Sequence, residues 1–192
     1  MKMFKKLMAV ALAGVLALTV LTGCGSSVDR KEFVRYLNDN VKFLAGSGMM
    51  ELSDAGKEQA GKVIALVQEA YNKTADDEKA DFDPMDALQN SRDEVTDYPD
   101  NLNPMYKSVE KALGLTKDTK DTYLFSIVTV DKNTSEYNQK YATSQLAQKA
   151  MARENLVPLV NGDGFGNKGT VSFDTVTLGD TEYLVVVVKI IA

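Results

Sequence analysis

Hydrophobic residues recur every three or four positions in several stretches of this chain, and this period indicates amphipathic helices. The clearest stripe predicts a helix over residues 53–73. Similar patterns predict helices over 29–45 and 134–155, and a shorter one over 104–113. The inward positions of the two longest helices are Ala60, Val63, Ile64, Val67 and Tyr71 in the first, and Ala142, Leu146, Ala147, Ala150 and Met151 in the second.

Signals for β-strands appear only after residue 120. Runs of aromatic and β-branched residues predict strands over 122–130, 169–178 and 181–191. The last run is apolar without interruption from Leu184 to Val188. Both of its faces must therefore be covered, and we place it in the middle of the sheet. Gly179 and Asp180 form the two-residue connection that a tight hairpin requires.

The order of these elements predicts a topology. Antiparallel pairing on both sides of the central strand makes 122–130 and 169–178 parallel to each other, and the helix 134–155 must cross over between them. We therefore predict an α+β fold, in which N-terminal helices precede a split β-α-β unit with a small, mainly antiparallel three-stranded sheet. The two N-terminal helices are expected on the face that the crossover helix leaves bare. The run 156–160 contains Pro158, which restricts it to a sheet edge or a loop.

Residues 74–103 differ in character from the rest of the chain. They contain ten acidic residues against Lys79 and Arg92, and Pro84 and Pro99 interrupt them. We predict a mainly irregular acidic segment outside the core, with one weak helix over about 84–95. Carboxylates can bind calcium weakly outside the cell, but charge runs are usually solvated surface, so we assign no metal ligand to this segment.

The N-terminus has the three-part layout of a secretory signal peptide. A basic start with Lys2, Lys5 and Lys6 precedes an uncharged run from Leu7 to Leu21. A helix over this run would be about 22 Å long, whereas the apolar core of a bilayer is roughly 30 Å thick. The run is therefore too short for a comfortable permanent span.

The run ends in Leu21-Thr22-Gly23-Cys24, which resembles the lipobox of bacterial lipoproteins. The resemblance covers only these four residues and the signal segment before them. It implies that a dedicated signal peptidase cuts between Gly23 and Cys24, and that the thiol of Cys24 carries diacylglycerol, whose acyl chains include fatty acids such as palmitate. The new amino terminus of such proteins is often acylated as well. Two or more acyl chains anchor a protein stably, whereas one gives only marginal binding.

This resemblance sets the expected organisation of the chain. Residues 1–23 are expected to be a lipoprotein signal peptide, residues 24–28 a short tether, and residues 29–192 a single extracytoplasmic domain. Lipid on Cys24 would hold that domain at the outer face of the cell membrane. The partner that this implies is the membrane itself, reached through the lipid anchor.

Composition narrows the chemistry that the domain can perform. Removal of residues 1–23 takes away three lysines and no acids, so the formal charge changes from −5 to −8. An acidic surface argues against nucleic acid or anionic lipid as a partner. The chain has no histidine, and Cys24 is its only cysteine. Histidine-assisted nucleophilic catalysis, the common zinc sites and an intramolecular disulfide are therefore excluded.

A glycine-rich loop at 162–169 resembles two kinds of binding loop in part. Gly164, Gly166 and Gly169 have the G-x-G-x-x-G spacing of a nucleotide site, but a predicted strand follows them where a dinucleotide site has a helix. The same loop begins like an EF-hand, yet Phe165 and Ser172 stand where oxygen ligands are required. We interpret it as a connection into an edge strand.

Ser108 and Lys111 form an S-x-x-K pattern like that of penicillin-binding enzymes. The companion motifs S-D-N and K-T-G are absent from the chain, so the pattern alone does not predict an enzyme. An enzyme of this composition would depend on a carboxylate pair or on a serine–lysine pair.

We therefore assign no catalytic residue, cofactor or metal ligand. The leading hypothesis is a membrane-anchored envelope lipoprotein that serves as a binding or protein-interaction module, with envelope proteins as candidate partners. The alternative is a small cell-wall-directed hydrolase that uses acidic residues. A third hypothesis is a ligand carrier lined by tyrosines such as Tyr137 and Tyr141, four positions apart on the crossover helix.

Overall fold

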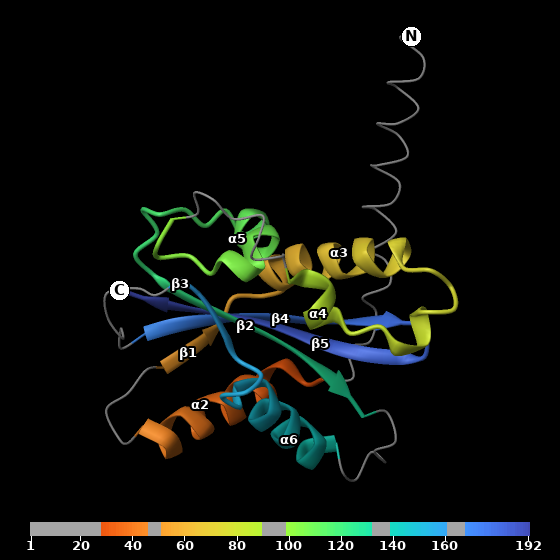
Figure 1. The fold of residues 1–192 in the computed structure, drawn as a ribbon. Helices are drawn as coiled ribbons and strands as arrows, with labels where there is room; N and C mark the ends of the chain where they lie inside the picture. Colours follow the sequence, from red (N-terminus) through yellow and green to blue (C-terminus); the bar gives the residue numbers. More distant parts are fainter. Residues whose placement is uncertain (1–27, 46–50, 90–98, 132–138, 161–167) are drawn as a thin grey trace, which may run out of the picture.

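One five-stranded sheet runs through the structure, and helices cover both of its faces (Figure 1). The computed structural model describes residues 28–45, 51–89, 99–131, 139–160 and 168–192. Sheet and helices form an α+β domain, which confirms the predicted fold class. In chain order the elements are α2 (Arg30–Ala45), β1 (Glu51–Asp54), α3 (Glu58–Lys73), the 3₁₀ helix η1 (Lys79–Asp81), α4 (Pro84–Leu88), the 3₁₀ helix η3 (Pro104–Tyr106), α5 (Lys107–Leu113), β2 (Thr122–Val130), α6 (Gln139–Met151), β3 (Val157–Val160), β4 (Lys168–Leu178) and β5 (Thr181–Ile191).

The strand order is β1-β4-β5-β2-β3. β5 is central and antiparallel to both β2 and β4, which are therefore parallel to each other, with α6 between them in the chain. This is the predicted split β-α-β arrangement. The predicted number of three strands is wrong, because β1 adds to β4 in parallel and β3 adds to β2 antiparallel. β3 contains Pro158 and lies at the edge of the sheet, which agrees with the prediction of a sheet edge or a loop for this run.

β1 overlaps the start of the helix that we predict over 53–73 at Ser53 and Asp54. Residues Glu51–Asp54 pair with β4 instead, and α3 begins only at Glu58. Gly56, with a φ angle of 74°, turns the chain between the strand and the helix. Leu52 is the one buried residue of this short strand. Its sequence therefore carries too little alternation for a strand prediction.

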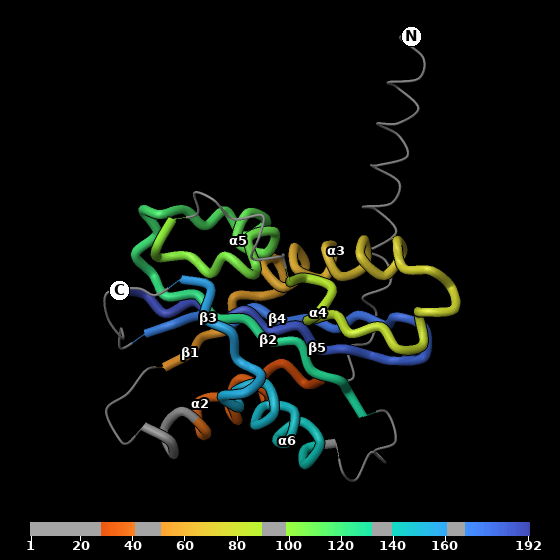
Figure 2. Tube along the Cα trace, viewed as in Figure 1, coloured from red at the N-terminus to blue at the C-terminus, as the bar shows by residue number. Residues whose placement is uncertain are grey.

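The helices form a layer on each face of the sheet (Figure 2). α3, α4 and α5 pack on one face, whereas α2 and α6 lie against each other on the opposite face. The prediction that both N-terminal helices lie opposite the crossover helix is therefore wrong for α2. α6 turns mainly small residues, such as Ala147 and Ala150, toward the sheet. Phe33 and Leu37 of α2 supply the larger buried side chains on that face.

The acidic segment 74–103 belongs partly to the core, contrary to our expectation. Pro84 and Leu88 are buried in α4, and Phe82 and Met85 pack against the same hydrophobic cluster. The predicted weak helix ends at Leu88, and residues 90–98 lie outside the described residues. Apolar side chains of the segment reach the core, while the carboxylates in its described part stay at the surface.

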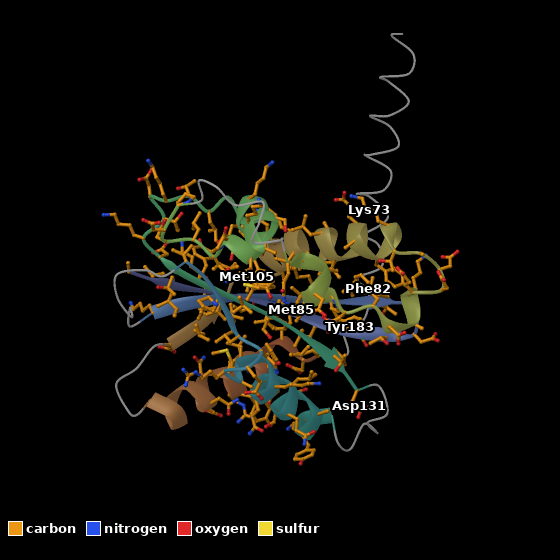
Figure 3. The ribbon with its side chains drawn as sticks, viewed as in Figure 1. Lys73, Phe82, Met85, Met105, Asp131 and Tyr183 are labelled. Carbon is orange, nitrogen blue, oxygen red and sulfur yellow. The ribbon has the colours of Figure 1, made fainter. Side chains whose placement is uncertain are left out.

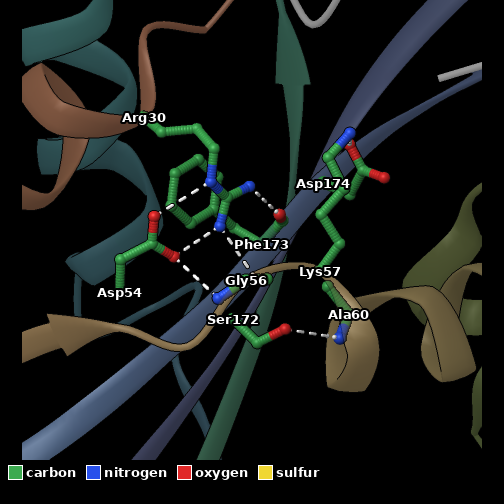
Figure 4. Close-up of polar contacts among 8 residues, drawn as sticks. All are labelled: Arg30, Asp54, Gly56, Lys57, Ala60, Ser172, Phe173 and Asp174. Carbon is green, nitrogen blue, oxygen red and sulfur yellow. Dashed lines mark hydrogen bonds and ion pairs between the residues drawn. The ribbon is translucent and has the colours of Figure 1, made fainter. Parts of the chain in front are cut away.

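Arg30 fastens the start of α2 to the sheet (Figure 4). Its Nη1 donates to the carbonyl oxygen of Phe173 and its Nη2 to that of Gly56, both at 2.8 Å. Its Nε donates to Oδ2 of Asp54 at 3.0 Å, and its guanidinium lies 3.9 Å from the centre of the Phe173 ring. The hydrogen bond from Arg30 lowers the pKa of Asp54 below its usual range. Val28, which we place in the tether, is also buried, so the packed structure includes the residues directly before α2.

Candidate functional site

The sheet edge formed by β1 is closed by a side chain. Nδ2 of Asn38, on α2, donates to the carbonyl oxygen of Leu52 at 2.9 Å, and the N–H of Leu52 donates to Oδ1 of Asn38 at 2.8 Å. Unpaired strand edges are templates for pairing with another chain. Asn38 satisfies the donor and the acceptor that a further strand would use at Leu52.

The edge formed by β3 is closed by other means. Pro158 has no N–H to offer, and the backbone N–H of Asn103 donates to the carbonyl oxygen of Leu159 at 2.9 Å. Nδ2 of Asn103 donates to the carbonyl oxygen of Pro158 at 3.2 Å. Leu102 also forms an isolated antiparallel bridge with Val160. The outer side of β3 is therefore occupied by the segment that precedes η3.

The C-terminal half of β2 has no such closure. β5 pairs with β2 along its whole length, whereas β3 pairs only with residues Tyr123–Phe125. Residues 126–130 therefore have a strand on one side only. Within the described ranges, no backbone hydrogen bond reaches their other side. We call residues 126–130 the open edge of β2.

A cavity of about 400 Å³ lies against the open edge. In Figure 1 this part of β2 runs between α4 on one side and α6 on the other. The walls come from α4, from the open edge, and from the end of α6 with the turn that follows it. Representative residues of these three walls are Met85, Ile127 and Glu154 respectively. We call this cavity the β2 groove.

The floor of the β2 groove is largely aromatic and apolar. Burial raises the pKa of both Tyr106 and Tyr183, which line it. The ring of Tyr106 packs edge-on against Phe125 with centroids 5.1 Å apart, and the hydroxyl of Tyr183 donates to the carbonyl oxygen of Phe82 at 3.3 Å. Met85 and Tyr183, labelled in Figure 3, both line the groove and pack against the same hydrophobic cluster. Such a floor suits a hydrophobic side chain.

The rim of the β2 groove carries charges of both signs. Nζ of Lys149 donates to Oγ1 of Thr129 at 2.8 Å. Thr129 alternates with Val128, which faces α6, so Lys149 reaches from α6 across the open edge to the other face. Oδ1 of Asp83 accepts the N–H groups of Met85 and Asp86 at 2.7 and 3.2 Å and so caps α4. Glu154 is exposed at the opposite rim.

A second cavity of about 340 Å³ lies at the β4–β5 hairpin. Tyr71 and Phe82 line it with their rings edge to face, 5.2 Å apart, and Lys79 lies over the Tyr71 ring at 5.4 Å. Gly179, with a φ angle of 57°, forms the turn, and a Cβ atom there would lie 3.0 Å from the Tyr71 hydroxyl. The second cavity therefore lies where these side chains pack against a tight turn, and we do not propose it as a binding site.

Glu110 of α5 is a buried acid with 1% of its surface exposed. Burial raises its pKa to about 7, although the backbone N–H of Asn103, which donates to Oε1, opposes this shift. Oε2 of Glu110 has no hydrogen-bond partner among the described residues. Glu110 does not line the β2 groove. No local pattern in the sequence marks Glu110, which stands at one of the two free positions of the S-x-x-K pattern.

The candidate residues from the sequence lie apart from the β2 groove or outside the described residues. Gly23, Cys24, Tyr137 and most of the glycine-rich loop fall outside the described residues. Ser108 and Lys111 lie one turn apart on α5, and Lys111 is exposed. Tyr141 is 65% exposed, so it does not line a space between α6 and the sheet.

The acidic cluster is dispersed over the surface. Asp76 pairs with Lys79 at 2.6 Å, and Asp83 caps α4. Among the residues that the structure describes, no group of three or more His, Cys, Asp or Glu side chains could hold a metal ion.

Comparisons with known proteins add no family to this picture. The chain matches no protein-family model, no curated protein and no solved structure. Within the described part of the chain, no helix has the length and apolar character needed to cross a membrane. The β2 groove, a cavity with mixed apolar and polar walls beside an unpaired strand edge, is therefore the candidate site, and it rests on geometry alone.

Proposed function

We propose that this chain is a lipid-anchored lipoprotein of the bacterial envelope, and that its domain binds a partner protein in the β2 groove on the extracytoplasmic side of the cell membrane. The observation that carries the binding role is the cavity of about 400 Å³ against the open edge of β2. Binding sites are typically concave and combine apolar surface with a few polar groups, and the β2 groove combines apolar and aromatic residues with charged and polar ones. The anchor rests on Leu21-Thr22-Gly23-Cys24 and the signal segment before it.

The alternative of an acid-dependent hydrolase has weaker support. Asp83 and Glu154 line the same cavity from different elements, but both are exposed and Asp83 is engaged as a helix cap. A hydrolase of this type needs one carboxyl group whose pKa is raised by its surroundings so that it can act as an acid. Among the described residues, the acid whose pKa is raised in this way is Glu110, which lies outside the groove. Binding therefore remains the better-supported function.

Crosslinking in intact cells tests the binding role. A photoreactive amino acid is placed in the full chain at Gln89 or Glu154, two exposed positions of the β2 groove. The matched control position is Glu51, which is also exposed but lies on β1 at the opposite edge of the sheet. We expect both groove positions to give the same adduct with an envelope protein, and Glu51 to give none.

Two outcomes would contradict the proposed function. Absence of any adduct from both groove positions would show that the groove is unoccupied in the cell. Equal adducts from all three positions would show contact by proximity rather than binding at the groove.

A further inference from the structure

The hydrogen bonding at the edges of the sheet indicates what kind of partner the β2 groove binds. We propose that an extended segment of the partner protein binds at the open edge of β2 as an additional β-strand. This inference rests on the proposed function, because it specifies how the β2 groove takes its partner. It names an extended polypeptide as the occupant rather than a folded surface, a helix or a small molecule.

The chemistry of an unpaired edge selects this occupant. Alternate residues of a strand direct their N–H and C=O groups to the same side, and an extended chain presents the matching groups at the matching spacing. Residues 126–130 keep one such side without a hydrogen-bonded partner among the described residues. Five residues of strand span about 17 Å, which is enough for a short strand in globular proteins.

At the edges of β1 and β3, other parts of the chain form hydrogen bonds with the backbone of the strand. Asn38 covers β1 at Leu52, and Asn103 with Pro158 covers β3. Natural proteins protect their edges because an open edge pairs readily with other chains. The open edge of β2 differs from these two in that, among the described residues, no hydrogen bond closes its backbone groups and only the side chain of Lys149 crosses it. The cavity beside this edge leaves room for a pairing segment.

The position for an added strand is defined by β3. β3 lies beside Tyr123–Phe125 and begins at Val157, and the chain before it turns away toward the end of α6. A partner segment at the open edge would continue the line of β3. It would lie in the space where the cavity is found, between α4 and the end of α6.

The walls of the groove indicate the side chains that such a segment carries. Successive side chains of a strand point to opposite faces. Those on the α4 side meet Met85, Tyr106 and Ile127, so apolar residues fit at alternate positions. Asp83 and Glu154 against Lys149 leave the rim with one more acid than base, which favours a segment that carries a basic residue.

Lys149 accounts for how the open edge avoids pairing with a second copy of this chain. Its ammonium group crosses the edge to reach Thr129. A lysine on an edge strand is a common device against self-association. Its hydrogen bond lies at the exposed rim, so a partner segment could displace it at small cost. Two acidic copies of the chain would in addition repel each other.

The test uses the full chain in mild detergent and linear ten-residue peptides selected from a displayed random library. Binding of a selected peptide should slow amide hydrogen exchange at residues 126–130 and leave β1 unchanged. Two N-methylated versions of the peptide are then made, one with methyl groups on its odd-numbered amides and one with methyl groups on its even-numbered amides. Only one version should bind more weakly, by roughly tenfold or more, because only alternate amides of a strand pair with a neighbouring strand. The other version is the matched control.

The outcomes separate this inference from the proposed function. If peptides bind and compete with the crosslinks from Gln89 and Glu154, but the two methylated versions weaken equally and residues 126–130 gain no protection, strand addition is wrong and groove binding stands. If no peptide is selected while the crosslinks persist, the partner uses a folded surface and strand addition is also wrong. A dimer that protects residues 126–130 without peptide would assign the open edge to a second copy instead.

Discussion

Glu110 combines complete burial with a carboxylate oxygen that lacks a partner among the described residues. Its pKa is raised to about 7, mainly by burial. A carboxyl group in such surroundings is most stable in its neutral form. The cost of ionising it inside the fold therefore appears as a dependence of the free energy of unfolding on pH.

The raised pKa of Glu110 predicts the effect of Glu110→Gln on stability. The unfolded chain loses this proton near its ordinary pKa of 4.5, whereas the folded chain keeps it until about pH 7. The folded state therefore binds more protons between these values, and the stability of the native chain falls as the pH rises from 4.5 to 7. The Gln variant removes this loss and should be more stable at pH 8, by about 3 kcal/mol, with little difference at pH 4.

Urea unfolding at pH 4, 6 and 8 measures this difference. Glu51→Gln, at an exposed position of β1, serves as the control and should keep the pH slope of the native chain. If Glu110→Gln keeps the native slope too, the carboxyl group is not the source of the pH dependence.

The sequence could not reveal Glu110 as a buried acid. Helical spacing identifies Val109 and Leu113 as inward positions of α5, and a glutamate between them is ordinarily solvated. Glu110 is buried because the segment around Asn103 folds over it, a tertiary contact that no local pattern reports. Cys24 is the opposite case, because its role follows from a contiguous pattern in the sequence and needs no tertiary structure.

Among the elements, β2, β4 and β5 could be predicted to within a residue. Their runs of β-branched and aromatic residues are long, and the hairpin at Gly179 has a clear local cause. β1 could not, because it is four residues long and is held by β4 and Asn38 rather than by its own pattern. The open edge of β2 also escaped prediction, since it depends on where β3 stops.

The closure of the β1 edge leads to a prediction for Asn38→Ala. The variant leaves both the N–H and the C=O of Leu52 without their partner in a half-buried setting. We expect a loss of about 1 to 3 kcal/mol in the free energy of unfolding and faster amide exchange at Leu52. Urea unfolding and hydrogen exchange measure these effects.

Asn72→Ala, at an exposed position of α3, is the control for this change. It should alter the free energy of unfolding by a few tenths of a kcal/mol at most. Unchanged exchange at Leu52 in the Asn38 variant would show that the edge is held by β4 alone.

For the whole molecule, the class and the split β-α-β core could be predicted, but the distribution of helices between the two faces could not. Periodicity shows that a helix has an inward side and does not show which face of the sheet it covers. α2 joins α6 because the small residues of α6 leave room for Phe33 and Leu37. The β2 groove results from this two-sided layering, since it lies where α4 and the end of α6 approach one edge.

The proposed anchor gives a prediction at the scale of the whole chain. Cys24→Ala removes the thiol that would carry diacylglycerol, so lipid labelling should be lost and the chain should accumulate as an unprocessed or released product. Metabolic labelling with a fatty-acid analogue, followed by fractionation, measures both effects. Ser26→Ala, two residues further along, is the control and should be labelled normally. Normal labelling of Cys24→Ala, or a native precursor found intact in the cytosol, would refute the anchor.

Arg30 has a mechanical consequence for a protein tethered by its N-terminus. A pull from the tether would enter the fold at Val28 and pass at once to the guanidinium of Arg30. That group is bonded to the backbone at Phe173 and Gly56, so the load would be shared between β4 and the turn before α3. Separation of the start of α2 from the sheet would require the hydrogen bonds from Arg30 to Phe173 and Gly56 to break. The domain of a chain tethered in this way should therefore resist distortion under tension.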